Sequence, residues 1–150
     1  MILSTIKSTI AAALVISGSA FAQDEGGPVK YENAEYFSMT NVDFKPGKAE
    51  RAFEIIREHF MKASEAASLP EPYALHFKTG EWDAAFIWKL ESGPADLEWY
   101  RSPNDIKWME ALAKQEGSKE AAGKLMEEWN SLIARSSGTF GHWHKKPEKK

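Results

Sequence analysis

Near its C-terminus the chain carries a His-x-His pair, His142 and His144. Residues two apart on a β-strand share a face with Cα atoms about 6.5–7 Å apart, so both imidazoles can reach one metal ion. His76 falls on the same side of a sheet, because it alternates with the apolar residues of its own run. Three imidazoles would form the protein half of an open zinc or copper site. Alternatively, all three are polar side chains at a subunit boundary or facing solvent.

Tryptophan is the second residue type that indicates chemistry. Aromatic rings offer a flat, apolar ligand a large contact area with fixed geometry. The indoles that can line such a cleft are Trp82, Trp88, Trp99, Trp108 and Trp129. Alternatively, these indoles are ordinary core residues. The chain has no paired carboxylates, Ser/His/Asp order, Gly-rich phosphate loop or His-Glu-x-x-His motif, so no catalytic residue is assigned.

Composition excludes several classes of protein. The 150 residues are 43% hydrophobic and 27% charged with a net charge of -3, which is typical of one folded domain. A chain with this net charge has no excess of basic residues that would bind phosphate groups, so nucleic acid is not an expected partner. The absence of cysteine excludes disulfides, thiol nucleophiles and cysteine-based metal sites.

The alternation of apolar residues predicts the elements that must position these side chains. A strand is expected over 36–44, and an apolar stripe at three- and four-residue spacing predicts a helix over 49–67. Two alternating runs, 73–78 and 82–90, flank a turn and predict a β-hairpin. The last strand is expected over 139–144.

Three further helices are expected between the hairpin and the last strand. A short helix begins after Ser92 and runs through Tyr100. Ser102 followed by Asp105 three residues later is typical of a capping box, and Ser118 caps the third of these helices. The apolar stripe of that last helix continues to the turn at 136–138.

This order of elements predicts a ferredoxin-like α+β sandwich, in which an antiparallel sheet carries helices on one face. Phe44, Phe86 and Trp143 are expected to face the helices. The opposite face then carries Phe37, Met39, Ala85, Ile87 and, in this phasing, Phe140. A second subunit packed sheet on sheet would cover that apolar face, so a homodimer is expected. His76 and the His142–His144 pair lie on opposite edge strands, so they can meet only across such a dimer.

Several segments together resemble the dimeric α+β barrels, which include antibiotic-biosynthesis-type monooxygenases, haem-degrading monooxygenases and NIPSNAP-like proteins. The residues that carry the resemblance are Phe44-Lys-Pro-Gly47, Ile87-Trp-Lys-Leu90 and Leu97-Glu-Trp-Tyr-Arg-Ser-Pro103. The resemblance covers residues 35–144 and implies a fold more than an activity, since this fold hosts oxygenases, isomerases and binding proteins.

The resemblance also implies positions for a site. Haem-degrading members use an Asn on the first strand, a Trp before the long helix and an iron-binding His on that helix. Trp99 matches the Trp position, Thr40 aligns with the strand position and Met109 stands where the His would be. Without that imidazole haem is not expected. We therefore expect a ligand cleft formed by Thr40, Trp88, Trp99 and Met109, with no cofactor unless the histidines hold zinc or copper.

The N-terminus indicates where the protein acts. Residues 1–22 have a basic residue, an apolar run and Ala20-Phe21-Ala22 at the cleavage position, as in a secretory signal peptide. The apolar run is too short to span a bilayer. A flexible leader is expected over 23–33, the domain over 34–144 and a basic tail over 145–150.

The sequence therefore predicts a periplasmic or secreted α+β barrel protein that binds a small apolar or aromatic ligand between its helices and its sheet. One alternative is a cofactor-independent monooxygenase of the antibiotic-biosynthesis type, which needs an apolar pocket and a polar group that deprotonates the substrate. The other is a structural or assembly protein whose cleft is filled by its own tryptophans.

Overall fold

Residues 27–145 are described in a computed structural model of the chain. The expected signal peptide at 1–22 and the tail beyond residue 145 lie outside this range. The chain divides into two units, Met1–Lys30 and Tyr31–Lys150. The sheet and the helices belong to the second unit. No helix within the described range is both long and apolar enough to cross a bilayer.

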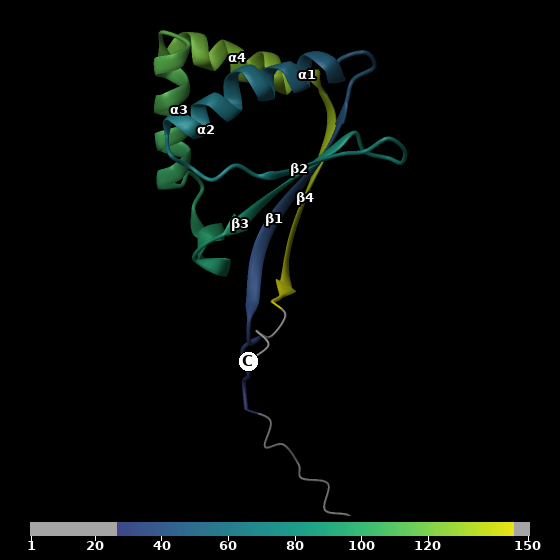
Figure 1. The fold of residues 1–150 in the computed structure, drawn as a ribbon, viewed down its shortest axis with the longest axis vertical. Helices are drawn as coiled ribbons and strands as arrows, with labels where there is room; N and C mark the ends of the chain where they lie inside the picture. The colour runs from purple at the N-terminus through teal and green to yellow at the C-terminus, as the bar shows by residue number, and fades with distance from the viewer. Residues whose placement is uncertain (1–26, 146–150) are drawn as a thin grey trace, which may run out of the picture. The chain divides into compact units, whose positions relative to one another are not determined.

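A four-stranded antiparallel sheet forms one layer (Figure 1). Its strands are β1 (Ala34–Phe44), β2 (Tyr73–His76), β3 (Ala84–Leu90) and β4 (Ile133–His144). They lie in the order β2-β3-β1-β4, and each neighbouring pair is antiparallel. This order, with helices between β1 and β2 and between β3 and β4, confirms the predicted ferredoxin-like α+β fold.

The helix between β1 and β2 is interrupted. It runs as α1 (Ala49–Ile55), a π-helical turn η1 (Ile56–Phe60) and α2 (Met61–Ala66). The predicted apolar stripe is present. The wider π-helical turn at η1 rotates the residues that follow it around the helix axis, relative to a regular α-helix. π-helical turns inside α-helices often accompany functional sites.

The connection between β3 and β4 contains the remaining helices. These are a 3₁₀ segment η2 (Gly93–Glu98), α3 (Pro103–Gln115) and α4 (Lys119–Leu132). The predicted capping box is confirmed, because the Ser102 hydroxyl accepts from the Asp105 amide and the Asp105 carboxylate accepts from the Ser102 amide. The Ser118 hydroxyl likewise accepts from the Ala121 amide at 3.0 Å.

The start and the register of β4 both differ from the sequence-based predictions. α4 ends at Leu132, and Ile133 already has extended backbone, so residues expected to end the helix at 136–138 belong to the strand. The register of β4 also differs from the expected phase. His142 lies opposite Tyr36 and Phe140 opposite Ser38, so Phe140 is on the helix side of the sheet. Trp143 therefore lies on the opposite face, where it was not expected.

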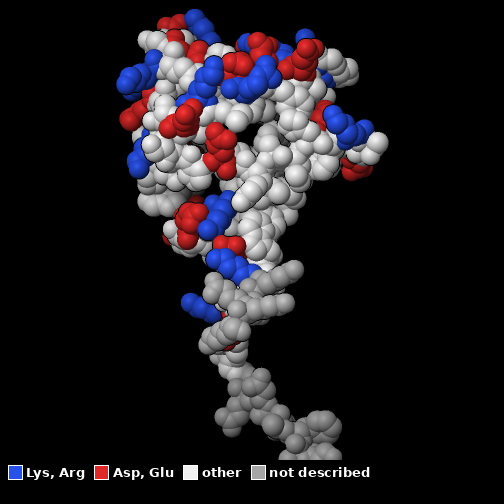
Figure 2. All heavy atoms as spheres, viewed as in Figure 1, with Lys and Arg blue, Asp and Glu red and all other residues white. Residues whose placement is uncertain are grey.

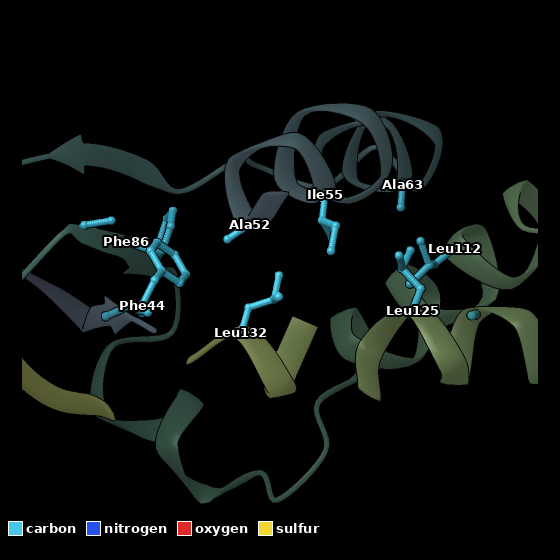
Figure 3. Close-up of a cluster of buried hydrophobic side chains, with 11 residues drawn as sticks. Phe44, Ala52, Ile55, Ala63, Phe86, Leu112, Leu125 and Leu132 are labelled. Carbon is cyan, nitrogen blue, oxygen red and sulfur yellow. The ribbon is translucent and has the colours of Figure 1, made fainter. Parts of the chain in front are cut away.

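The buried core lies partly between the helices and the sheet and partly between the helices themselves. In Figure 3, Phe44 and Phe86 lie at one side of the core, and Leu112 and Leu125 lie together at the other. Ile55 and Leu112 are the largest fully buried side chains. The remaining buried members of this cluster are Val42, Ala52, Ala63, Ala84, Ala122 and Leu132.

Leu112 provides a test of this core. We expect Leu112→Ala to lower the free energy of unfolding by about 2–5 kcal/mol, because the cavity it leaves adds to the lost burial. Ile106→Ala, on the same helix but 45% exposed, should change it by about 0.5 kcal/mol or less. Urea unfolding followed by circular dichroism measures both. Equal losses would show that α3 does not pack as described.

Candidate functional site

A cavity of about 480 Å³ lies between the helices and the sheet. Its floor comes from β1 and β3, through Thr40, Val42, Phe86 and Trp88. Its other apolar walls come from the helices, the loop after α2 and the start of β4: Ile56, Phe60, Met61, Leu69, Pro70, Pro72, Trp108, Trp129 and Ile133. The polar lining residues include Ser64, Glu71, Asn104 and Ser136.

The position of the cavity follows from how far the helices reach. Figure 1 shows β1 and β4 running past the four α-helices, which gather over one end of the sheet. An added Cβ at Gly138, which lies opposite Thr40, would meet no atom within 4 Å. The sheet is therefore open on its helix side directly beside the cavity floor.

Edge-to-face aromatic contacts form the inner wall. The Phe60 ring lies 5.2 Å from Trp108 and 5.3 Å from Trp129, at interplanar angles of 69° and 72°. On the floor, Phe86 and Trp88 have ring centroids 6.1 Å apart. Such edge-to-face pairs hold rings in fixed orientations. The wall is thus preformed and mostly aromatic.

The indole N–H of Trp108 has its hydrogen-bond acceptors within this wall. It donates to the Ser64 hydroxyl at 3.1 Å and to the Phe60 carbonyl at 3.3 Å. The Ser64 hydroxyl itself donates to the same carbonyl. Because these donors are already paired, Trp108 leaves the cavity an apolar ring with no competing hydrogen bond.

Charge is scarce at the cavity. Lys89 contributes to the lining, but its ammonium is 3.4 Å from both Glu35 and Glu91. The Asp105 carboxylate is held by the α3 capping box. The Glu71 carboxylate has no ion-pair partner among residues 27–145. In Figure 2, acidic and basic side chains gather over the helices, while the middle of the strand layer is largely uncharged.

The structure brings together two of the four predicted ligand residues. Thr40 and Trp88 both line the cavity. Trp99 does not line it and is 58% exposed in the segment after η2. Met109 packs against the hydrophobic core from α3. The sequence interpretation did not name Phe60 or Ser136 as site residues; Phe60 belongs to the helical stripe that predicted core, and Ser136 was expected at a helix end.

The three histidines are divided between two places. The imidazoles of His142 and His144 have centroids 5.0 Å apart on β4. His76 lies on β2, at the opposite edge of the sheet, with its ring 4.3 Å from that of Phe53. Within residues 27–145, no group of three or more His, Cys, Asp or Glu side chains is placed to hold one metal ion.

The face of the sheet away from the helices carries Phe37, Met39 and Ile87 side by side, because Met39 pairs with Ile87 in the register of β1 and β3. Phe37 stacks on Trp143 at 4.9 Å and lies over Gly141. A Cβ at Gly141 would come within 2.8 Å of the Phe37 ring, so this position needs glycine.

Glu35 anchors the end of that face. The Trp143 indole donates to one carboxylate oxygen at 2.7 Å, and the Lys145 ammonium lies 2.9 Å from the other. These hydrogen bonds, the one from Trp143 first, lower the pKa of Glu35 from 4.5 to about 2. The ionised carboxylate is therefore the form that the fold stabilises.

Comparisons with known proteins define the class of fold. No protein-family model and no curated protein matches the chain. Among solved structures, it is similar to a NIPSNAP family protein with unknown function from Agrobacterium tumefaciens str. C58, with a TM-score of 0.52 and 8% identity over 79% of this chain and 96% of that one.

Two other solved structures are more distantly similar. A second NIPSNAP family protein from the same organism has a TM-score of 0.47 and 10% identity, covering 71% of this chain and 90% of its own. An uncharacterized NIPSNAP domain protein from Burkholderia xenovorans has a TM-score of 0.43 and 8% identity, covering 70% of this chain and 90% of its own. The similarity to the first of these structures confirms the predicted NIPSNAP-like, ferredoxin-like fold. At 8% identity it gives no information about activity or ligand.

The lowered pKa of Glu35 predicts how stability depends on pH. Since the folded-state pKa lies below the ordinary value, the contribution of Glu35 is complete above about pH 4.5 and is lost as the pH falls towards about 2. The melting temperature of the wild type should therefore exceed that of Glu35→Gln at pH 4.5, and the gap should narrow towards pH 2. Thermal circular dichroism over this range measures the gap. A gap that is independent of pH would contradict the assigned contacts.

Proposed function

We propose that the protein binds a small, flat, apolar or aromatic molecule in the cavity between its helices and its sheet. The observation that carries this proposal is the aromatic cavity itself. Its volume of about 480 Å³ falls within the range of small-molecule sites, about 300–1,000 Å³. Five aromatic rings line it, from Phe60, Phe86, Trp88, Trp108 and Trp129.

The charges around the cavity favour a ligand without negative charge. The ammonium of its one lining lysine, Lys89, is already close to two carboxylates, whereas the lining residue Glu71 has no cationic partner in the described range. An anionic ligand would lose its hydration without gaining a counter-charge. The polar edge of a neutral ligand has Thr40 and Ser136 among the lining residues as possible partners.

We place this binding in a homodimer in the periplasm or outside the cell. The location rests on the signal-like segment at 1–22. The dimer rests on the sheet face that bears Phe37, Met39 and Ile87, which continues at the edge into Tyr73 and Leu75, 70% and 45% exposed. A second copy presenting the same face would remove this patch from water by an isologous contact.

Binding is tested with N-phenyl-1-naphthylamine, a neutral fluorescent probe of suitable size. We expect saturable enhancement of its fluorescence. Trp88→Ala should weaken its affinity by about 2- to 12-fold, because one aromatic contact is worth about 0.5–1.5 kcal/mol. Trp99→Ala is the matched control, an exposed indole outside the cavity, and should leave the affinity unchanged.

Two outcomes would contradict the proposal. No saturable binding at all would mean that the cavity is closed in solution. Equal loss in the Trp88 and Trp99 variants would place the probe on the exposed surface instead.

The dimer is tested separately by light scattering. We expect the wild type to have twice the mass of one chain and Ile87→Asp to have the mass of one, since an unpaired carboxylate in a dry interface is strongly unfavourable. Ile106→Asp, on the helix side of the molecule, should remain dimeric. A monomeric wild type at micromolar concentration would refute the dimer.

A further inference from the structure

His142 and His144 belong to the C-terminal end of β4, and neither lines the cavity. In Figure 1 this end of β4 runs beyond the four α-helices. Both are on the helix side of the sheet, since His142 pairs with Tyr36 in the register of β1 and β4. Their rings are 5.0 Å apart between centroids and nearly perpendicular, at 85°. The proposed ligand site makes no use of them.

The distance between the two rings fits one metal ion held between them. Zinc lies about 2.0–2.1 Å from an imidazole nitrogen, hence about 3.2 Å from the ring centre, so two imidazoles at a tetrahedral angle have centres about 5.2 Å apart. At the right angle of a tetragonal copper site the centres would be about 4.5 Å apart. The 5.0 Å separation is closer to the tetrahedral value.

Two tyrosine rings lie against this pair. The ring of Tyr31 lies 4.4 Å from that of His142 and 5.7 Å from that of His144. The ring of Tyr36 lies 5.6 Å from that of His142 and is itself stacked on Phe140. Packing that limits the rotamers of two ligands lowers the entropy lost when they bind an ion.

We propose that His142 and His144 of a single chain chelate a zinc ion at the end of β4, leaving its other positions to water or a small anionic ligand. This site differs from the three-histidine site expected from the sequence. His76 is at the opposite edge of the sheet and packs on Phe53, so the pair has no need of a partner subunit.

The chain allows a clean test because it has four histidines and no cysteine. Zinc binding is measured by titration calorimetry on untagged protein at about pH 7.5, where imidazole is mainly neutral. We expect one ion per chain in the wild type, with affinity weakened about tenfold or more in both His142→Ala and His144→Ala, because the chelate is lost. His59→Ala and His76→Ala are matched controls and should bind like the wild type.

A second readout separates chelation from a general structural effect. In ¹⁵N-labelled protein, zinc should shift the imidazole resonances of His142 and His144 and leave those of His59 and His76 in place. Equal affinity in all four variants would overturn the proposal. A loss in His76→Ala as large as that in His142→Ala would also overturn it, in favour of a site shared between two chains.

Discussion

β1 and β4 are much longer than the helices that pack on them, and this mismatch determines the rest of the architecture. With 11 and 12 residues, the two strands are about 36–40 Å long at 3.3 Å per residue. α4, with 14 residues, reaches about 20 Å at 1.5 Å per residue. α3 packs mainly on α2 and α4 and adds little cover to the strands. The helices can therefore cover only part of the sheet. The uncovered part contains both the open side of the cavity and the histidine pair.

Side-chain size determines how the covered and uncovered parts meet. Alanine occupies fully buried positions of the core, since Ala52, Ala63, Ala84 and Ala122 have no exposed surface. At the cavity, aromatic side chains line the space between the helices and the sheet. Trp129 belongs to both regions, since its ring lies 5.7 Å from Phe44 in the core and 5.3 Å from Phe60 in the cavity wall. Core and cavity are thus two parts of one aromatic and aliphatic layer.

The sequence predicted the order of elements well because strong local signals mark their ends. Ser102 with Asp105 and Ser118 mark helix starts through hydrogen bonds that the structure contains. The predicted phase of β4 was wrong because Ser136, Ser137, Gly138 and Thr139 precede its aromatic residues, so the alternation of apolar residues there is too weak to orient the strand. A register shift against β1 at Asp43 and Phe44 further changes that phase.

The candidate site was predicted only in part, for a related reason. Thr40 and Trp88 were identified because strand alternation fixes the face on which they lie. Trp99 and Met109 were predicted from the family resemblance. That resemblance matches positions along the sequence, but it does not fix how the helices of this chain are oriented over the sheet. The π-helical turn η1 ends at the cavity residue Phe60. It was not predicted, because the spacing of apolar residues in this segment is that of a regular α-helix.

The central claim is that the aromatic cavity is open in solution and receives a ligand, instead of closing on its own tryptophans. The most direct test is the detection of intermolecular nuclear Overhauser effects from N-phenyl-1-naphthylamine to isotope-labelled protein. We expect contacts from the probe's ring protons to Phe60, Trp88 and Trp129, whose rings line the cavity. Contacts confined to exposed aromatic residues such as Trp99 and Tyr100 would contradict it.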